Sequence, residues 1–178
     1  RRGTTLIFHP DPEIFGAHAR FKPAVLYQMV RSRAYLFKGV EIRWSCAEEL
    51  LKSVDKVPSS ETLHFPGGIA DYLSESMAGV DMVTPKIFAG EADFNDDSGR
   101  LEWAIAWPVQ EEGFLRSYCN TVVTPQGGTH ELGLRQGMTR SLRSYGELIG
   151  NRKASQITSD DCIGDAAVIL SVFVRDPQ

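Results

Sequence analysis

The strongest pattern in the sequence is an amphipathic segment that runs from about Thr129 to Ile149. Apolar residues recur along it at a step of about 100° per residue, which is the angular step of an α-helix. The stripe consists of Leu134, Met138, Leu142, Tyr145 and Ile149, whereas Arg140, Arg143 and Glu147 point away from it. A helix with one apolar face needs another layer to cover that face, so the segment predicts a layered domain.

Segments with strand patterns supply that other layer. They are Thr4–Phe8, Val40–Trp44, Thr62–Phe65, Lys86–Ala89, Leu101–Trp107, Phe114–Thr124 and Ala166–Val174. Shorter helices are expected to start near Pro23, near Ile69 and after Thr158, where Asp161 completes a capping box. Because helices and hairpin-forming strands are mixed along the chain, the sequence predicts an α+β sandwich in which helices pack on a sheet.

Composition narrows the class of protein further. The 178 residues suggest one domain and suffice to bury about 70% of the unfolded surface, so no disulfide or metal is needed for stability. Cys46, Cys119 and Cys162 form no CxxC pair, which indicates free thiols in the reducing cytoplasm. No apolar run reaches the roughly 18–20 residues that span a bilayer, so no membrane partner is expected.

The sequence lacks a complete metal or catalytic motif. The four histidines show no paired spacing, and no G-x-S-x-G or P-loop motif occurs. The acidic loop Asp93–Ser98 resembles a calcium loop, but Ser98 stands where the turn needs glycine and Ala104 where a bidentate glutamate is needed. A hairpin turn is the preferred interpretation of this loop. We expect no metal site and no catalytic residue, although a dispersed small-molecule site stays open as an alternative.

The segment Gln126–His130 leads into the long helix. Its two glycines allow a tight turn, and Thr129 is expected to cap the first free backbone amides of the helix. A helix start of this kind also attracts anions. The turn and cap are the simpler interpretation of the motif.

Two sets of arginines stand out in a chain whose net charge is −4. Arg31 and Arg33 lie in the first expected helix, and Arg135, Arg140 and Arg143 lie in the long one. The net charge argues against a uniformly basic nucleic-acid surface but leaves local basic stripes open. These arginines are therefore either solvated side chains or residues that follow a phosphate backbone.

Several ordered motifs resemble the B subunits of bacterial type II topoisomerases. Residues Gly3–Asp11 look like the last strand of the GHKL ATPase domain, where the family reads G-T-x-V-x-F-x-P-D. The motifs similar to later landmarks are Gly39–Ile42, Phe65–Ile69, Gln126–His130 and Ser171–Gln178. Together they cover nearly the whole chain in the family order, which is more specific than any single motif.

Within this family the sequence is closer to topoisomerase IV than to gyrase. The runs Trp103–Trp107, Ser117–Asn120 and Gly133–Gly137 are similar to topoisomerase IV forms. Gyrases usually carry a G-F-R-x-A-like run and a second asparagine in these places. The resemblance therefore favours the B subunit of topoisomerase IV, with that of gyrase second.

The resemblance implies two parts in the chain. Residues 1–16 are expected to be the terminal strand and exit of the GHKL ATPase domain, and residues 17–178 the transducer domain, which stops before the family's Gln-Thr-Lys loop. The transducer is expected to be a two-layer α+β sandwich with a left-handed βαβ crossover, an exception to the usual right-handed rule. Both ends of the chain are thus expected to be cuts inside a longer protein.

The resemblance also implies roles for individual residues. Thr4 matches the family threonine that helps to hold adenine. The intact enzyme uses ATP and magnesium, but its catalytic glutamate, magnesium-binding asparagine and γ-phosphate lysine are expected outside this chain. The chain alone should therefore bind neither cofactor and should not hydrolyse ATP. Gln126, Gly127, Gly128, Thr129 and His130 are expected to be structural, and Arg135, Arg140 and Arg143 are candidate DNA-facing residues.

In this family two B subunits trap ATP, dimerise at the gate for incoming DNA and drive one duplex through a break in another. The expected partners are the A subunit of topoisomerase IV, double-stranded DNA and a second copy of the B subunit, all in the cytoplasm. The expected role is to relay ATP binding and hydrolysis to DNA relaxation and decatenation. The alternatives are the corresponding gyrase domain and a non-catalytic binding module that shares the fold.

Overall fold

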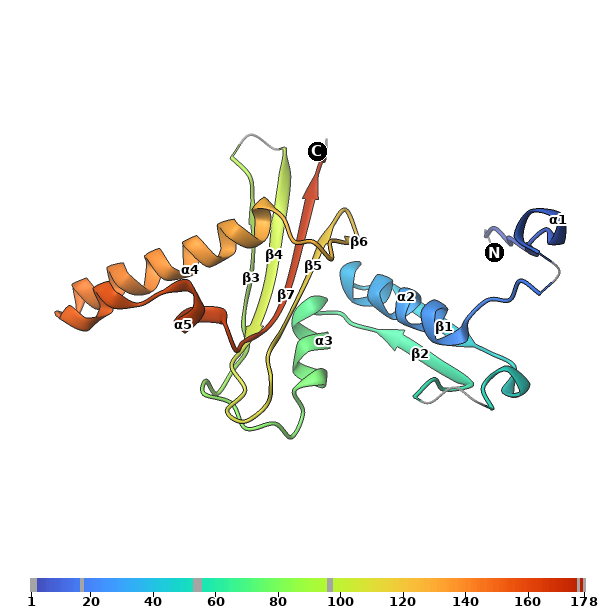
Figure 1. Cartoon of the computed structure of the whole chain (residues 1–178), viewed down its shortest axis with the longest axis horizontal. Helices are drawn as coiled ribbons and strands as arrows, with labels where there is room; N and C mark the ends of the chain where they lie inside the picture. The colour runs from blue at the N-terminus through green and yellow to red at the C-terminus, as the bar shows by residue number, and fades with distance from the viewer. Residues whose placement is uncertain (1–2, 17, 53–55, 96–97, 176, 178) are drawn as a thin grey trace. The chain divides into compact units, whose positions relative to one another are not determined.

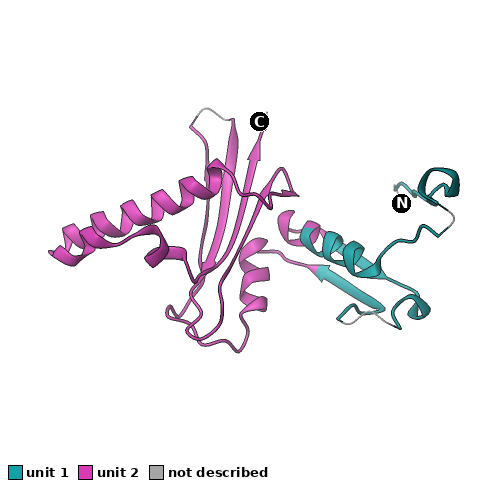
Figure 2. Cartoon of the chain, viewed as in Figure 1, with its two compact units in different colours: residues 1–32, 42–63 teal, residues 33–41, 64–178 magenta. Residues whose placement is uncertain are grey.

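A computed structural model of the chain describes residues 3–16, 18–52, 56–95, 98–175 and 177. They belong to two compact units, which Figure 2 distinguishes by colour. Unit 1 comprises residues 1–32 and 42–63, and unit 2 comprises residues 33–41 and 64–178. The helix α2 (Pro23–Leu36) contributes to both units, because its residues 33–36 belong to unit 2.

Unit 1 consists mainly of a helix packed on a two-stranded sheet. Its elements are α1 (Pro12–Phe15), the first part of α2, the short 3-10 helix η1 (Glu48–Leu50), and all but one residue of each of the paired strands β1 (Glu41–Ser45) and β2 (Ser60–His64). Tyr27 of α2 donates a hydrogen bond to Glu61, and its ring lies 5.5 Å from that of Trp44. These contacts fix α2 on the sheet. The expected helix start at Pro23 and the two expected strands are confirmed.

The expected strand over Thr4–Phe8 does not form in the described structure. Leu6, Ile7 and Phe8 are exposed, and no strand of the described chain pairs with them. A strand needs a neighbour for its backbone hydrogen bonds, so apolar and β-branched residues alone do not produce one.

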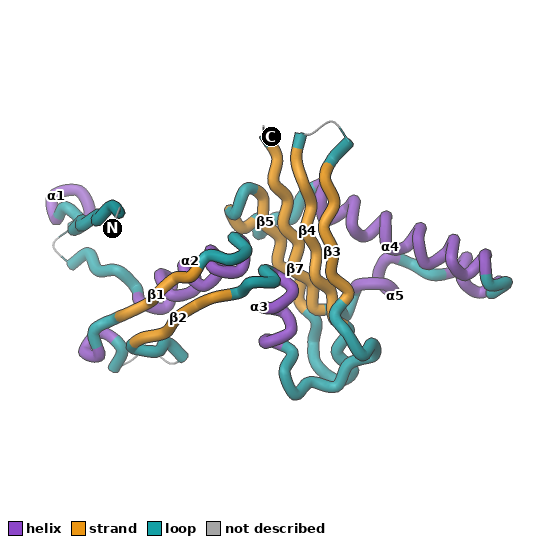
Figure 3. Tube along the Cα trace, turned by 180° about the vertical axis from the view of Figure 1, so that it is seen from behind, coloured by secondary structure: helices purple, strands orange, loops and turns teal. Residues whose placement is uncertain are grey.

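Unit 2 is built around a five-stranded mixed sheet, which Figures 1 and 3 show from opposite sides. Its strands in spatial order are β3 (Phe88–Asp93), β4 (Gly99–Ala106), β7 (Ala167–Val174), β5 (Phe114–Cys119) and β6 (Val122–Val123). β7 pairs antiparallel with β4 and parallel with β5. This central position explains its nearly continuous apolar sequence, because a strand inside the sheet is covered on both faces.

The parallel strands β5 and β7 are joined by a left-handed crossover. The connection passes through α4 (Thr129–Leu148), η2 (Arg152–Gln156) and α5 (Ser159–Ile163), and the start of α4 crosses in front of the sheet in Figure 1. The crossover begins and ends on adjacent strands. The predicted α+β class, its left-handed crossover and the long helix are therefore confirmed, as is the capping box of Thr158 and Asp161.

Helices cover both faces of this sheet. On one face, Leu134 of α4 and Ile163 of α5 pack with Ile105, Val168 and Leu170 of the strands. The opposite face carries α3 (Ile69–Ser76), which lies against β4 and β7. The second helical layer is an addition to the predicted two-layer arrangement. Fully burying a side chain such as Leu170 contributes about 1.5–3 kcal/mol, so both layers stabilise the sheet.

Two details of unit 2 differ from the sequence-based expectations. The long strand expected over 114–124 is divided, because Asn120 and Thr121 adopt positive φ angles of 47° and 68° and form a turn between β5 and β6. The apolar stripe of α4 is only partly covered. Leu134 and Met138 of its first half pack in the core of the sheet, whereas Leu142 and Tyr145 of its second half are exposed. In Figure 1, α4 extends past the edge of the sheet.

Candidate functional site

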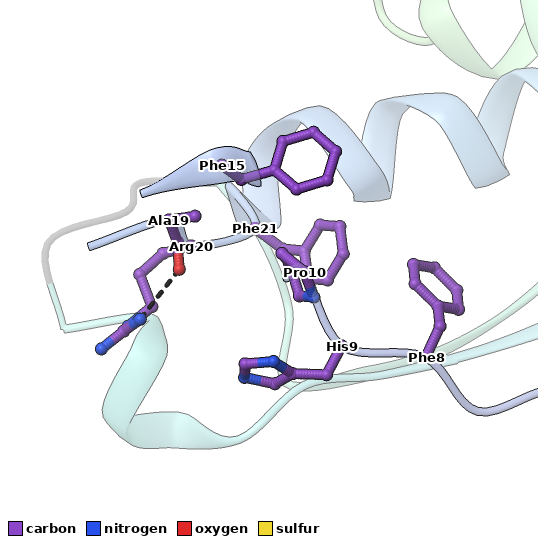
Figure 4. A pocket seen from close by; sticks show the side chains of 7 residues that line it. All are labelled: Phe8, His9, Pro10, Phe15, Ala19, Arg20 and Phe21. Carbon is purple, nitrogen blue, oxygen red and sulfur yellow. Dashed lines mark hydrogen bonds between the residues drawn. The ribbon is translucent and has the colours of Figure 1, made fainter. Parts of the chain in front are cut away.

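The N-terminal segment carries Thr4, the one residue expected to touch adenine. Thr4 is exposed and lies outside any helix or strand. A cavity of about 320 Å³ lies nearby in sequence, and Figure 4 shows its lining of Phe8, His9, Pro10, Phe15, Ala19, Arg20 and Phe21. The rings of Phe8 and Phe21 meet edge to face at 5.5 Å. Thr4 does not line this cavity, whose mainly apolar walls suit an apolar group better than a phosphate.

The turn before α4 joins β5 to the start of that helix. Ser117 of β5 lies within 2.5 Å of the Thr124 hydroxyl and also donates to the carboxylate of Glu131. His130 contacts the same Thr124 hydroxyl at 3.3 Å. The polar groups around the Gln126–His130 turn therefore bond largely to one another, which fits a structural role.

The expected cap by Thr129 is wrong. α4 begins at Thr129 itself, so the cap position falls on Gly128, which has no side chain to accept a hydrogen bond. Glu131 instead places a carboxylate in the first turn, where negative charge is stabilised by the helix dipole. Since the helix start already has its own carboxylate, a second anion would be repelled there.

The three candidate DNA-facing arginines lie on α4 but have different surroundings. Arg135 forms an ion pair with Asp160 at 3.5 Å, and Arg143 donates through Nε to the Ile157 carbonyl at 2.8 Å. Arg140 is exposed. The guanidinium groups of Arg135 and Arg143 thus have local partners, and each retains further N–H donors. Their contact with DNA stays a prediction.

Arg33 has a structural role that the sequence did not indicate. Its guanidinium donates to the carbonyl of Thr121 at 2.5 Å, in the turn between β5 and β6. Thr121 is β-branched and has a positive φ, a conformation that is unfavourable for such a residue. The arginine therefore satisfies a carbonyl in a strained turn rather than facing solvent.

The same turn holds the end of β7. Asn120 donates through Nδ2 to the carbonyl of Val174 and accepts at Oδ1 from its amide, both at 2.9 Å. The amide of Arg175 donates to the Ser98 carbonyl at 3.1 Å. In the sequence, Asn120 stood out only as part of a family motif. The signal it contained was an asparagine within a strand-like run, because asparagine tolerates positive φ.

A cluster of tyrosines connects the end of α2 to the sheet. The ring of Tyr35 stacks on that of Tyr72 at 4.1 Å, and the Tyr35 and Tyr118 hydroxyls lie 2.6 Å apart. Arg116 donates to the Tyr72 hydroxyl at 3.1 Å. Burial, together with the bond to Tyr118, raises the pKa of Tyr35 far above its ordinary value. This cluster rigidifies unit 2 and carries no reactive group.

Neither a metal cluster nor a membrane helix is found in the described parts of the chain. No group of three or more His, Cys, Asp or Glu side chains there could hold a metal ion. Among the same residues, no helix is both long and apolar enough to cross a bilayer. The acidic loop between β3 and β4 closes a hairpin through the bond from the Phe94 amide to the Gly99 carbonyl, and its residues 96 and 97 lie outside the described residues.

The fold of the chain is similar to those of solved gyrase B and topoisomerase IV domains. The chain is similar to the 43K ATPase domain of Thermus thermophilus gyrase B, with a TM-score of 0.73 and 23% identity over 95% of this chain and 44% of that one. It is also similar to the topoisomerase IV ATP-binding domain of Francisella tularensis, with a TM-score of 0.67 and 25% identity over 93% of this chain and 42% of that one.

Sequence comparison shows the family to which the chain belongs. The profile of the DNA gyrase B family matches residues 68–178, which is more than half of the chain, and the chain therefore belongs to that family. It is 49% identical over 178 residues to the B subunit of DNA topoisomerase 4 from Bartonella bacilliformis. That match covers 100% of this chain and 26% of the relative, so the chain spans about a quarter of the relative's length.

Proposed function

We propose that this chain is the transducer domain of a topoisomerase IV B subunit, preceded by the end of its ATPase domain. In this role it relays ATP binding and hydrolysis to DNA strand passage, which relaxes and decatenates DNA. The observation that carries the proposal is the 49% identity, over the whole chain, to the B subunit of a DNA topoisomerase 4. The B subunit of a gyrase is the second candidate, because solved gyrase B domains share the fold.

The proposed division of the chain places residues 1–16 in the ATPase domain and residues 17–178 in the transducer domain. In support, Leu6, Ile7 and Phe8 form an apolar run that is exposed in this structure. A run of this kind is stabilised when it joins a sheet, because its backbone groups gain partners and its side chains leave water. We place its sheet in the ATPase domain.

The cofactors of the proposed enzyme are ATP and magnesium, and this chain contributes Thr4 to the adenine pocket. The catalytic and metal-binding groups belong to the rest of the full-length protein. The chain therefore transmits the state of the nucleotide and does not itself catalyse hydrolysis. Its three free cysteines suit action in the reducing cytoplasm.

The proposed partners are the A subunit of topoisomerase IV, double-stranded DNA and a second copy of the B subunit. Arg135, Arg140 and Arg143 supply positive charge on one helix for the phosphates of that DNA. Arg140 is exposed, and the other two arginines keep N–H donors beyond those bound locally.

The test is the activity of the full-length protein that contains this chain, in complex with its A subunit. ATP-dependent decatenation and relaxation without introduction of negative supercoils is the expected result. Negative supercoiling would assign the chain to gyrase instead. Absence of any ATP-dependent change in DNA topology would refute the proposed function, as would ATP turnover by the isolated chain.

A further inference from the structure

Glu102 is a buried carboxylate in the sheet of unit 2. It lies on β4, is 1% exposed, and faces away from the core formed with α4 and α5. Burying a charge is costly unless opposite charges are close. Two cations meet this need: Arg100 Nη2 lies 3.2 Å and Lys38 Nζ 3.7 Å from the Oε1 atom of Glu102.

Arg100 extends this cluster to the end of β7. Arg100 and Phe173 are directly opposite each other on β4 and β7, and the guanidinium carbon lies 4.9 Å from the centre of the Phe173 ring. A guanidinium over an aromatic face is attracted by the negative face of the ring. The carboxylate of Glu102 thus positions the guanidinium of Arg100, and this guanidinium in turn contacts the ring of Phe173.

Lys38 extends the cluster in the other direction, to the exit of α2. It follows the C-terminus of that helix by two positions, beside Phe37, whose ring lies 6.5 Å from that of Phe173. Phe173 is therefore contacted by both Arg100 and Phe37. The exit of α2 and the end of β7 are linked by both charge and aromatic contact.

The close approach of Gly68 to Lys38 gives a reason for the glycine that directly precedes α3. Gly68 has a positive φ of 68°, and a Cβ atom there would lie 2.8 Å from Cγ of Lys38. Glycine therefore makes room for the lysine stem on its way to Glu102. The sequence indicated the Phe65–Ile69 motif only as a family landmark, and this contact gives a physical reason for the glycine at position 68.

Resting on the proposed function, we propose that Glu102 is a positioning residue which couples the exit of α2 to the end of β7, so that nucleotide-driven movement reaches the segment after Val174. Arg100 and Lys38 are the two cations with which it forms the ion pairs described above. Without the carboxylate charge, Lys38 and Arg100 lose their common partner, and the exit of α2 is no longer linked through Arg100 to Phe173. ATP turnover then continues while fewer turnovers produce strand passage.

The test uses the full-length protein in complex with its A subunit and measures ATP turnover with DNA and decatenation in the same reaction. Glu102→Gln keeps the shape of the side chain and removes its charge. We expect ATP turnover within about twofold of the unsubstituted enzyme and decatenation per ATP lowered at least about fivefold. Lys38→Met, at a position whose side chain is 39% exposed, should give the same loss. The double variant should be no worse than either single one, because both break one linkage.

Glu91→Gln is the matched control. Glu91 also pairs with Lys38, at 2.5 Å, but its side chain is 60% exposed. The hydrogen bond from Lys38 lowers the pKa of Glu91, so the pair exists at neutral pH. Since an exposed pair contributes little, decatenation per ATP should stay unchanged in this variant.

Three results would overturn the inference: unchanged decatenation per ATP in both Glu102→Gln and Lys38→Met, an equal loss in Glu91→Gln, or additive losses in the double variant. If Glu102→Gln lowers the unfolding temperature so far that it cannot be assayed, the comparison of Lys38→Met with Glu91→Gln decides. An unsubstituted enzyme that performs no ATP-dependent decatenation refutes the proposed function instead, which keeps the two failures distinct.

Discussion

The side chain of Asn120 pairs with the backbone of Val174 as a neighbouring strand residue would. It donates to the Val174 carbonyl and accepts from its amide, both at 2.9 Å, while its own amide donates to Val172 at 2.8 Å. β5 ends at Cys119, so this asparagine continues the pairing of β7 after the strand itself has turned away.

Replacing Asn120 should loosen the end of β7. Asn120→Ala removes both side-chain bonds and also disfavours the positive φ, whereas Asn120→Gly removes the bonds but keeps the backbone conformation accessible. Losing the two bonds should lower the free energy of unfolding by about 1–3 kcal/mol. Urea denaturation measures the decrease in the free energy of unfolding of both variants, and this decrease should be larger for Asn120→Ala. A glycine variant as stable as the unsubstituted chain would contradict the importance of the bonds.

Adding a methyl group at Gly146 should destabilise the packing of α4 on η2. A Cβ atom there would lie 2.0 Å from Cβ of Ala154, so a shift of the backbone is required. Gly146→Ala should lower the free energy of unfolding by about 1–3 kcal/mol.

Gly137 of the same helix provides the control for Gly146. A Cβ atom at this position meets nothing within 4 Å. Gly137→Ala should therefore raise the free energy of unfolding by up to about 1 kcal/mol, because alanine is the better helix former. Thermal or urea denaturation of the two variants should give opposite signs. Equal signs would contradict the packing of Gly146 against Ala154.

The capping box of α5 should make stability depend on acidity. Hydrogen bonds from the Thr158 backbone and hydroxyl lower the pKa of Asp161 in the folded chain. A folded pKa below the unfolded value of about 3.9 means that the stabilisation is present above that pH and is lost as the pH falls through the folded pKa. The Asp161→Asn variant should therefore have a lower free energy of unfolding at pH 7 than the unsubstituted chain. On acidification, its free energy of unfolding should fall by a smaller amount. Urea denaturation midpoints of both proteins at pH 7 and pH 3 test this. An equal fall of the midpoint in the variant and in the unsubstituted chain would contradict it.

Removing the three arginines of α4 should weaken the response to DNA in the intact enzyme. In the variant with Arg135, Arg140 and Arg143 changed to alanine, DNA-stimulated ATP turnover should fall, and its dependence on salt should flatten. Each lost phosphate contact lowers the slope of log affinity against log salt by about 0.9. Gln136→Ala is an uncharged control on the same helix. An unchanged salt dependence in the triple variant would end the assignment of these residues to DNA.

The sequence predicted the elements whose signals are local. The helix of α4, the apolar strand β7 and the capping box of Thr158 are each encoded in a short run of residues. The family motifs likewise indicated the crossover. The helix cap was misplaced by one residue, because threonine and glycine at adjacent positions both suit a helix start.

What the sequence did not predict depends on residues far apart in the chain. Neither Lys38 and Glu102 nor Arg33 and Thr121 share any local pattern, and their contacts arise only when the sheet forms. The turn at Asn120 was missed because apolar residues on both sides suggested one strand. Strand Thr4–Phe8 had the right composition but no neighbouring strand in the described structure.

The position of β7 determines the order in which the sheet of unit 2 can assemble. β3 pairs with β4 and β5 with β6 as hairpins of neighbouring segments, but β7 separates the two pairs and follows all four strands in the chain. During synthesis, the residues of both hairpins are therefore made before residues 167–174, so the edges of β4 and β5 that pair with β7 lack their partner until this strand is complete. β7 then joins the β3–β4 and β5–β6 hairpins into one sheet in a single late step. Pairing between segments far apart in the sequence makes folding slow.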